Sequence, residues 1–280
     1  MKSMKKILLV AVIALVAIVC ASSVVSAGLF DFMGGSDANA TDDSLNGKEI
    51  NLAAAASLKN VYDEKLIPMF LEKYTGAKVT PTYASSGDLQ TQIENGLETD
   101  VFMSAGNKQM NALANESLID NDTNLQFLEN KVVLIVPADS DANISSFEDL
   151  KDVDGTIAIG DPESVPAGQY AKDVLTNLGV WDAVESKLSL GTDVTAVLNQ
   201  VAQGSADYGI VYSTDAKSMP DDVKVICEAP DDALSTPVVY PVAIIKDAKD
   251  ADAAQAFLDF LQTKEAKDVF VEYGFTIHEE

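Results

Sequence analysis

The chain has 280 residues, 47% of them hydrophobic, and its formal net charge is −25 at pH 7. This acidity disfavours binding to nucleic acid or to an anionic membrane, because both carry negative charge. The sequence contains no arginine, and its one histidine is His278. A bidentate guanidinium clamp is therefore excluded, and neither a Ser-His-Asp triad nor a histidine-rich metal site is expected.

The first 27 residues have the features of an export signal. Lysines at the start precede an apolar run over residues 7–19, and the segment closes on Ser26-Ala27, a cleavage-like pair of small residues. We expect residues 1–27 to be a signal peptide, since the apolar run is short for a membrane-spanning helix. An uncleaved anchor and lipidation at Cys20 are the alternatives.

Residues 28–48 are rich in Gly, Ser, Asp and Asn, which predicts a flexible tether. Asn39 starts an Asn-Ala-Thr glycosylation sequon in this segment. We expect an exported protein, either periplasmic or tethered to the outer face of the cell membrane. Folding should begin near Glu49, and the remaining residues suffice for one large domain or two lobes.

Without residues 1–27, 16 lysines oppose 44 acidic residues, a formal charge of −28 (16 − 44). Cys227 is then the single cysteine, so no internal disulfide is predicted.

In chain order, β-rich runs alternate with helical patterns. The helix after the first strand begins at Ser57, a natural N-cap, stops at Gly76, and is interrupted at Pro68. The strands are expected at residues 49–56, 78–84, 100–105, 131–137, 156–162, 206–212, 223–229 and 238–245. The other helices are expected from residue 88, and at residues 108–118, 147–153, 168–188, 193–204, 251–262 and 264–273. This alternation predicts α/β layers with mainly parallel strand pairing.

Small polar residues gather where these strands end and helices begin. The segments that contain them or follow the strands are Ser57, Ser85–Gly87, the turn Val165–Gly168, Asp193-Val194 and Tyr212. In open α/β sheets ligands collect beyond the carboxyl ends of the strands, where helix starts present free backbone N–H groups. Hydroxyl and N–H donors without a cation suit a small anion.

Each of these residues also has a purely structural interpretation. Ser57 is a good helix N-cap, Ser86 suits a loop, and Pro166 is common at the first position of a helix. The hydroxyl of Tyr212 at a strand end suits contact with water. From the residues alone, both interpretations stay open.

Several segments, in this order, resemble the molybdate-binding protein of ABC-type importers. The segment "GDPESVPAGQYA" (Gly160–Ala171) is the most specific, and the similarity spans about residues 49–277. The others are "AAASL" (Ala54–Leu58), "ASSGDL" (Ala84–Leu89), "DVFMSA" (Asp100–Ala105), Asp193-Val194, "GIVYSTDA" (Gly209–Ala216), "YPVAII" (Tyr240–Ile245) and "YGF" (Tyr273–Phe275).

The resemblance implies an α/β fold of the two-lobed, type II periplasmic-binding kind, with two α/β lobes joined by a hinge of crossing strands. Lobe one would combine residues 49–130 with 239–280, and lobe two would hold residues 131–238. The ligand cleft would lie between the lobes.

The resemblance also implies which groups hold the oxyanion. Ser57 and Ser86 would donate through their hydroxyls, Ala167 and Val194 through backbone N–H groups, and Tyr212 through its phenol. The metal would be contacted only through the oxygens of molybdate or tungstate, and no cofactor is expected. A family variant surrounds the metal with carboxylates, and Asp193 and Glu163 leave that alternative open.

The implied function is a receptor, not an enzyme, that delivers molybdate or tungstate to the permease and ATPase of an ABC importer, acting as a monomer. The alternatives are a receptor for another oxyanion such as sulfate, a serine-dependent hydrolase with Lys59 or Lys108 as base, and a structural surface module. Molybdate and tungstate have nearly the same size and charge, so the sequence does not separate them.

Overall fold

The computed structural model describes residues 42–279. The expected signal peptide, Cys20, Asn39 and the tether up to residue 41 lie outside the described residues. Within the described part, no helix combines the length and apolar character needed to cross a membrane.

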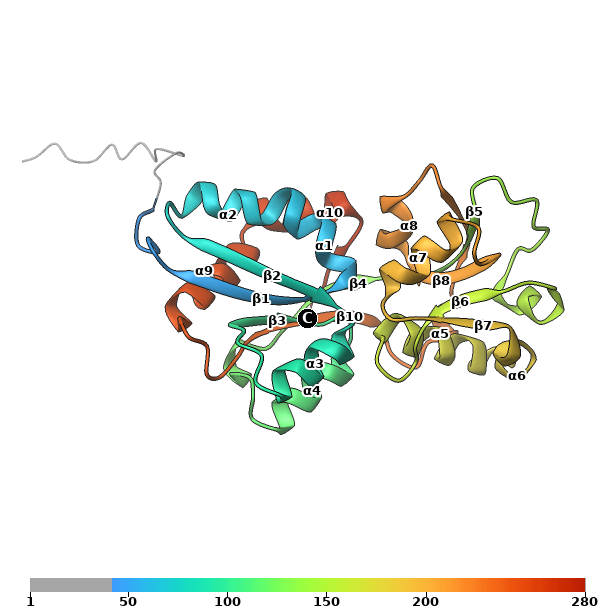
Figure 1. The fold of residues 1–280 in the computed structure, drawn as a ribbon, viewed down its shortest axis with the longest axis horizontal. Coiled ribbons are helices and arrows are strands. Elements are labelled where there is room, and N and C mark those ends of the chain that lie inside the picture. Colours follow the sequence, from blue (N-terminus) through green and yellow to red (C-terminus); the bar gives the residue numbers. More distant parts are fainter. Residues whose placement is uncertain (1–41, 280) are drawn as a thin grey trace, which may run out of the picture. The chain divides into compact units, whose positions relative to one another are not determined.

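The first lobe is built on a six-stranded sheet with the order β11-β4-β10-β3-β1-β2 (Figure 1). Its central strand β1 pairs in parallel with β2 and β3, whereas β10 runs antiparallel to β3 and β4. The strands are β1 (Glu49–Ala55), β2 (Lys78–Ala84), β3 (Val101–Met103), β4 (Leu125–Asn130), β10 (Val238–Ile244) and β11 (Thr276–Ile277).

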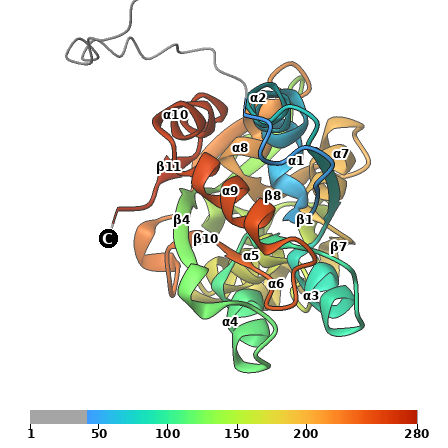
Figure 2. The same cartoon turned by 90° about the vertical axis from the view of Figure 1, so that its left-hand side faces the viewer.

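Helices cover both faces of this sheet, as the end-on view in Figure 2 shows. On one face α3 and α4 enclose Ala53 and Phe102, and on the other face Leu52 and Ala54 join the core that includes Phe257. Neighbouring strand residues point to opposite faces, so the apolar run of β1 fills both cores. The helices are α1 (Lys59–Val61), α2 (Ile67–Lys73), α3 (Ser86–Glu94), α4 (Asn107–Asn115), α9 (Ala251–Leu261) and α10 (Lys264–Tyr273).

The second lobe has a five-stranded sheet with the order β7-β6-β8-β5-β9. In Figure 1, α7 and α8 lie on one side of it, and α5 and α6 on the other. The strands are β5 (Val132–Pro137), β6 (Ile157–Gly160), β7 (Leu188–Gly191), β8 (Tyr208–Tyr212) and β9 (Val223–Glu228). The helices are α5 (Pro166–Asn177), α6 (Trp181–Val184), α7 (Val194–Ala202) and α8 (Ser213–Ser218).

The predicted α/β, two-lobed fold is confirmed, but the expectation of mainly parallel pairing was wrong. Four of the strand pairs in the described part of the chain are parallel and five are antiparallel. Only Lys131 separates β4 of the first sheet from β5 of the second. Two parallel neighbours in a sheet must be joined by a crossover connection. The strands beside the link at Lys131 have no such connection. The lobe boundaries expected from the sequence stay a prediction.

Two local features differ from the sequence expectation. Residues 42–48 of the predicted tether are part of the fold: the Asp42 N–H donates to the Lys73 carbonyl at 2.8 Å, and the Leu45 side chain is only 5% exposed. Leu45 is the single large apolar residue in that polar stretch, too weak a pattern to indicate packing. Pro68 does not end the helix, because a π-helical turn, Tyr62–Leu66, precedes it and α2 follows without a break.

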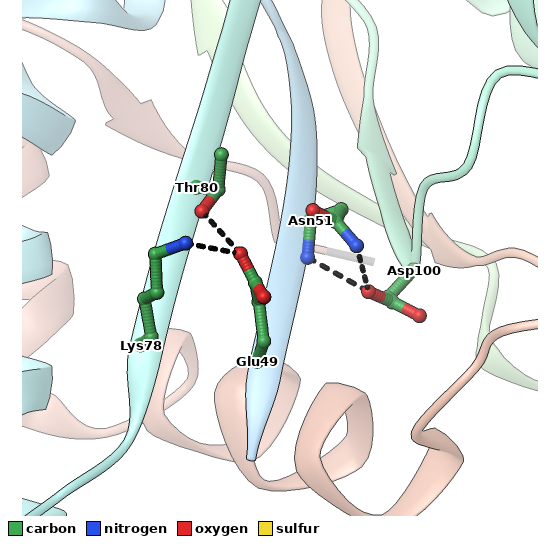
Figure 3. A network of polar contacts seen from close by, with 5 residues as sticks. All are labelled: Glu49, Asn51, Lys78, Thr80 and Asp100. Carbon is green, nitrogen blue, oxygen red and sulfur yellow. Dashed lines mark hydrogen bonds and ion pairs between the residues drawn. The ribbon is translucent and has the colours of Figure 1, made fainter. Parts of the chain in front are cut away.

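A buried carboxylate, that of Asp100, ties three segments of the first lobe together, and Figure 3 shows its bonds to Asn51. Asp100, 1% exposed, accepts the Asn51 N–H at 2.7 Å and the Asn51 side-chain amide at 3.2 Å. Its second oxygen accepts the Lys249 N–H at 2.8 Å. Nearby, Glu49 binds Lys78 and Thr80 at the surface. Asp100 is therefore the buried carboxylate of the two, and Glu49 is the one exposed to water.

We expect Asp100→Ala to lower the free energy of unfolding by about 3 kcal/mol or more, since it leaves several buried donors unpaired. Glu49→Ala, the control at a nearby carboxylate, should cost far less because its ion pair with Lys78 is exposed to water. Urea denaturation of both variants measures the difference. Equal losses in the two variants would contradict this account.

Candidate functional site

A small cavity lies between the two lobes, where the segments after β1, β2, β3, β6, β7 and β8 meet. Its volume is about 10 Å³, far below the roughly 300–1,000 Å³ of pockets for organic ligands. All five predicted site residues line it, and none lies elsewhere. The lining comprises Ala55, Ala56, Ser57, Ala84, Ser85, Ser86, Ala105, Val165, Pro166, Ala167, Asp193, Val194 and Tyr212.

Ser57 does not act as a helix N-cap. It lies inside the 3₁₀ turn Ala56–Leu58, whose N-cap is Ala55, and its side chain makes no capping bond. The Ser57 Oγ instead lies 3.0 Å from the hydroxyl of Tyr240. The structural interpretation of Ser57 as a cap was therefore wrong.

Ser85 and Ser86 have separate roles at the start of α3. Ser85 is the N-cap and accepts the Asp88 N–H at 3.1 Å. Ser86 is fully buried, and its Oγ accepts the Ala105 N–H at 3.0 Å. Because no acceptor for its own proton occurs within residues 42–279, the Ser86 hydroxyl can donate into the cavity.

The second lobe contributes two helix starts. Ala167 lies in the first turn of α5 and Val194 is the first residue of α7, where backbone N–H groups have no partner within the helix. The Asp193 side chain caps α7 by accepting the Ala196 N–H at 2.7 Å, so this carboxylate is engaged by its own helix. Glu163 is exposed and does not line the cavity.

Tyr212 closes the cavity at the end of β8. Its hydroxyl donates to the carbonyl of Ala105 at 3.3 Å, which links the second lobe to the first. Burial raises the pKa of Tyr212 well above its ordinary value, so the phenol stays neutral. Asp193 and Tyr212 are the only ionisable side chains in the cavity lining, and no lysine or histidine is among them.

Sequence reasoning missed several residues that hold these donors in place. Ala105 binds both Ser86 and Tyr212 through its backbone, and the Gly87 N–H donates to the Ser164 carbonyl at 2.9 Å. A side chain at Gly87 would lie 2.3 Å from that carbonyl oxygen, so only glycine allows this contact. The glycine in "SSGDL" was visible, but its partner is distant in the sequence.

A larger groove of about 500 Å³ borders the cavity and shares Ala56 and Ser57 with it. Asp215 of α8 lines this groove, is buried, and accepts the Tyr212 N–H at 3.2 Å. Burial raises the pKa of Asp215 to about 7.

Two α/β lobes, with a donor-lined cavity between them, define the class of two-lobed solute-binding proteins. A family model described as "Bacterial extracellular solute-binding protein" matches residues 50–276. The chain belongs to this family, and its fold is the type II periplasmic-binding fold.

Similar proteins cover most of this chain. It is 39% identical to the molybdate-binding protein ModA of Haemophilus influenzae over 232 residues, 81% of this chain and 90% of the relative. It is 37% identical to the putative ABC transporter substrate-binding lipoprotein YvgL of Bacillus subtilis, over 87% of this chain and 92% of the relative. A solved structure, the substrate binding domain of a putative molybdenum ABC transporter from Clostridium difficile, shares 40% identity with a TM-score of 0.64, covering 82% and 99% of the two chains.

The Asp215 carboxyl makes stability depend on pH. An unfolded Asp titrates near pH 4, so between about pH 4 and 7 the folded state holds a proton that the unfolded state has released. The stability that this proton contributes is complete below the unfolded pKa and is lost as pH rises through the folded pKa.

We expect the free energy of unfolding of the wild type to fall, relative to Asp215→Asn, by on the order of 1 kcal/mol per pH unit between about pH 4 and 7. Above this window the difference should level off. Urea denaturation of both proteins at pH 5, 6, 7 and 8 measures it, because other carboxyl groups titrate alike in both. Parallel curves would show that Asp215 ionises normally.

Proposed function

We propose that the chain is an exported receptor that binds molybdate or tungstate between its lobes and delivers it to the permease and ATPase of an ABC importer. The observation that carries this proposal is a small cavity whose lining brings together neutral hydrogen-bond donors from both lobes. The names of the ModA relatives support the choice of ligand.

The donors match the chemistry of a tetrahedral oxyanion. In the proposed complex Ser57 and Ser86 donate through hydroxyls, and Ala167 and Val194 donate through backbone N–H groups. Tyr212 donates through its phenol once its proton turns from the Ala105 carbonyl to the ligand. Hydrogen bonds to charged oxygens contribute roughly 1.5–3 kcal/mol each, so five can support tight binding. The starts of α5 and α7 add favourable partial charge.

Selectivity follows from the same donors. Hydrogen phosphate carries a proton for which the five proposed donors offer no acceptor, a mismatch of about 1–3 kcal/mol. Sulfate carries no proton near neutral pH, so only its smaller size opposes it. The acidic surface repels every anion alike, and discrimination must therefore arise inside the cavity.

The remaining parts of the proposal concern organisation and place. Lobe one holds residues 49–130 and 239–280, lobe two holds 131–238, and the mature protein acts outside the cytoplasm as a monomer without a cofactor. Binding changes no covalent bond of the ligand. The Ser57 and Ser86 hydroxyls are bonded to Tyr240 and to the Ala105 N–H rather than to a basic side chain, which favours a receptor over a serine-dependent hydrolase.

Calorimetric titration with molybdate, tungstate, sulfate and phosphate tests the proposal. We expect tight one-to-one binding of the first two, and a loss of more than about 100-fold in affinity in the Ser57→Ala/Ser86→Ala double variant, because two charge-assisted bonds disappear. Ser189→Ala is the matched control, since the Ser189 hydroxyl bonds Gln200 far along the second lobe. Binding of sulfate alone would keep the receptor and overturn its selectivity, and no heat with any anion would overturn the proposal.

Gly87→Ala tests whether the contact between Gly87 and the Ser164 carbonyl is needed for binding. The new methyl group would meet this carbonyl and hold the two segments apart, so affinity for molybdate should fall at least tenfold. Stability of the free protein should be unchanged or higher, because alanine favours α3. Thr91→Ala, at an exposed position of the same helix, should leave affinity unchanged. Unchanged affinity in Gly87→Ala would contradict this closure contact.

A further inference from the structure

Behind Ser57, on the side away from the cavity lining, lies the hydroxyl of Tyr240. Tyr240 is fully buried in β10, where the pairing with β4 shifts register between Tyr240 and Pro241. This bulge accommodates a proline within a central strand. The two hydroxyl oxygens of Tyr240 and Ser57 are 3.0 Å apart, and by themselves they do not reveal which one donates.

Asn130 determines the direction of this bond. Its Oδ1 accepts the Lys131 N–H at 2.9 Å and lies 3.0 Å from the Ser213 hydroxyl. A backbone N–H only donates, so this end of the amide must be the oxygen. The other end, Nδ2, therefore donates, to Thr214 at 2.9 Å and to the Tyr240 hydroxyl at 3.2 Å.

Because Tyr240 receives a hydrogen bond from Asn130, its own proton needs an acceptor. A fully buried phenol that leaves its proton unpaired loses the free energy of a hydrogen bond. The Ser57 Oγ, 3.0 Å from this hydroxyl, is in position to accept the proton. The neighbouring Tyr212 directs its own proton to the Ala105 carbonyl.

We propose that Asn130 and Tyr240 are positioning residues that fix the Ser57 hydroxyl as a donor toward the oxyanion. The inference rests on the proposed function and adds how that site selects its ligand. Tyr240 occupies a lone pair of the Ser57 oxygen, so the serine proton is left for the cavity. The Ala105 N–H donates to the Ser86 oxygen in the same way, so the Ser86 proton is also left for the cavity.

This polarity disfavours protonated oxyanions. A serine hydroxyl that can rotate freely can accept a proton from hydrogen phosphate or donate one to molybdate. With one of its two lone pairs taken by Tyr240, Ser57 presents its proton to the cavity. Asn130 and Tyr240 thereby favour fully deprotonated tetrahedral anions, although the geometry leaves neither residue in the cavity lining.

Tyr240→Phe, titrated with molybdate and with phosphate at pH 7.5, tests this relay. We expect molybdate affinity to fall about tenfold, while phosphate affinity stays constant or rises, so that the ratio of the two affinities shrinks. A double-mutant cycle gives the second readout: in a Ser57→Ala background, Tyr240→Phe should change molybdate affinity by less than about twofold.

Tyr62→Phe is the matched control. Tyr62 is equally buried in the first lobe, and its hydroxyl bonds the Met103 sulfur at 3.0 Å, away from the cavity. Urea denaturation confirms that each variant is folded before titration. If the wild type binds molybdate, two outcomes would overturn this positioning role. One is additive losses of affinity in the double-mutant cycle, and the other is an equal loss of affinity for both anions in Tyr240→Phe. A wild type that binds neither anion would overturn the proposed function itself.

Discussion

In the cavity between the lobes, the protein's own N–H groups bond to acceptor atoms of several lining side chains, and this leaves hydroxyl protons and nearby N–H groups for a ligand. The Ser86 oxygen accepts the Ala105 N–H, and the Asp193 carboxylate accepts the Ala196 N–H. The helix starts at Ala167 and Val194 contribute N–H groups, which cannot accept at all. Binding of an anion without any positive side chain depends on this one-sided arrangement.

The scaffold holds these donors close together by backbone contacts that tolerate no side chain. A Cβ atom on Gly168 would lie 2.0 Å from the Gly160 carbonyl oxygen, so α5 packs directly on the end of β6. Gly87 makes the corresponding contact across the cavity with Ser164. Glycine at these points brings helix starts nearer to the cavity than any other residue would allow.

Hydrogen bonds connect the link between β4 and β5 to the residues around the cavity. Asn130, at the end of β4, contacts Ser213 and Thr214 of the second lobe and Tyr240 of the first. The rings of Tyr212 and Tyr240 pack edge to face with centroids 5.6 Å apart. One buried group of residues therefore links the crossing strands with the hydroxyls that face the cavity, and a movement of the lobes would alter both together.

The sequence by itself determined most helices and strands, because apolar spacing and capping residues act over a few neighbours. It also indicated Ser57, Ser86, Ala167, Val194 and Tyr212, since strand ends followed by small donors can be read locally. Their binding role remains a prediction, although all five line one cavity.

Tertiary structure alone decided the mixed pairing of the sheets, the short strands β4 and β7, and the packing of Leu45. It also decided the direction of the Ser57 hydroxyl, through Asn130 and Tyr240. The direction of the Ser57 hydroxyl depends on distant partners: Asn130 lies 73 residues and Tyr240 183 residues from Ser57 along the chain. No local pattern records a hydrogen bond between side chains that only the folded backbone brings together.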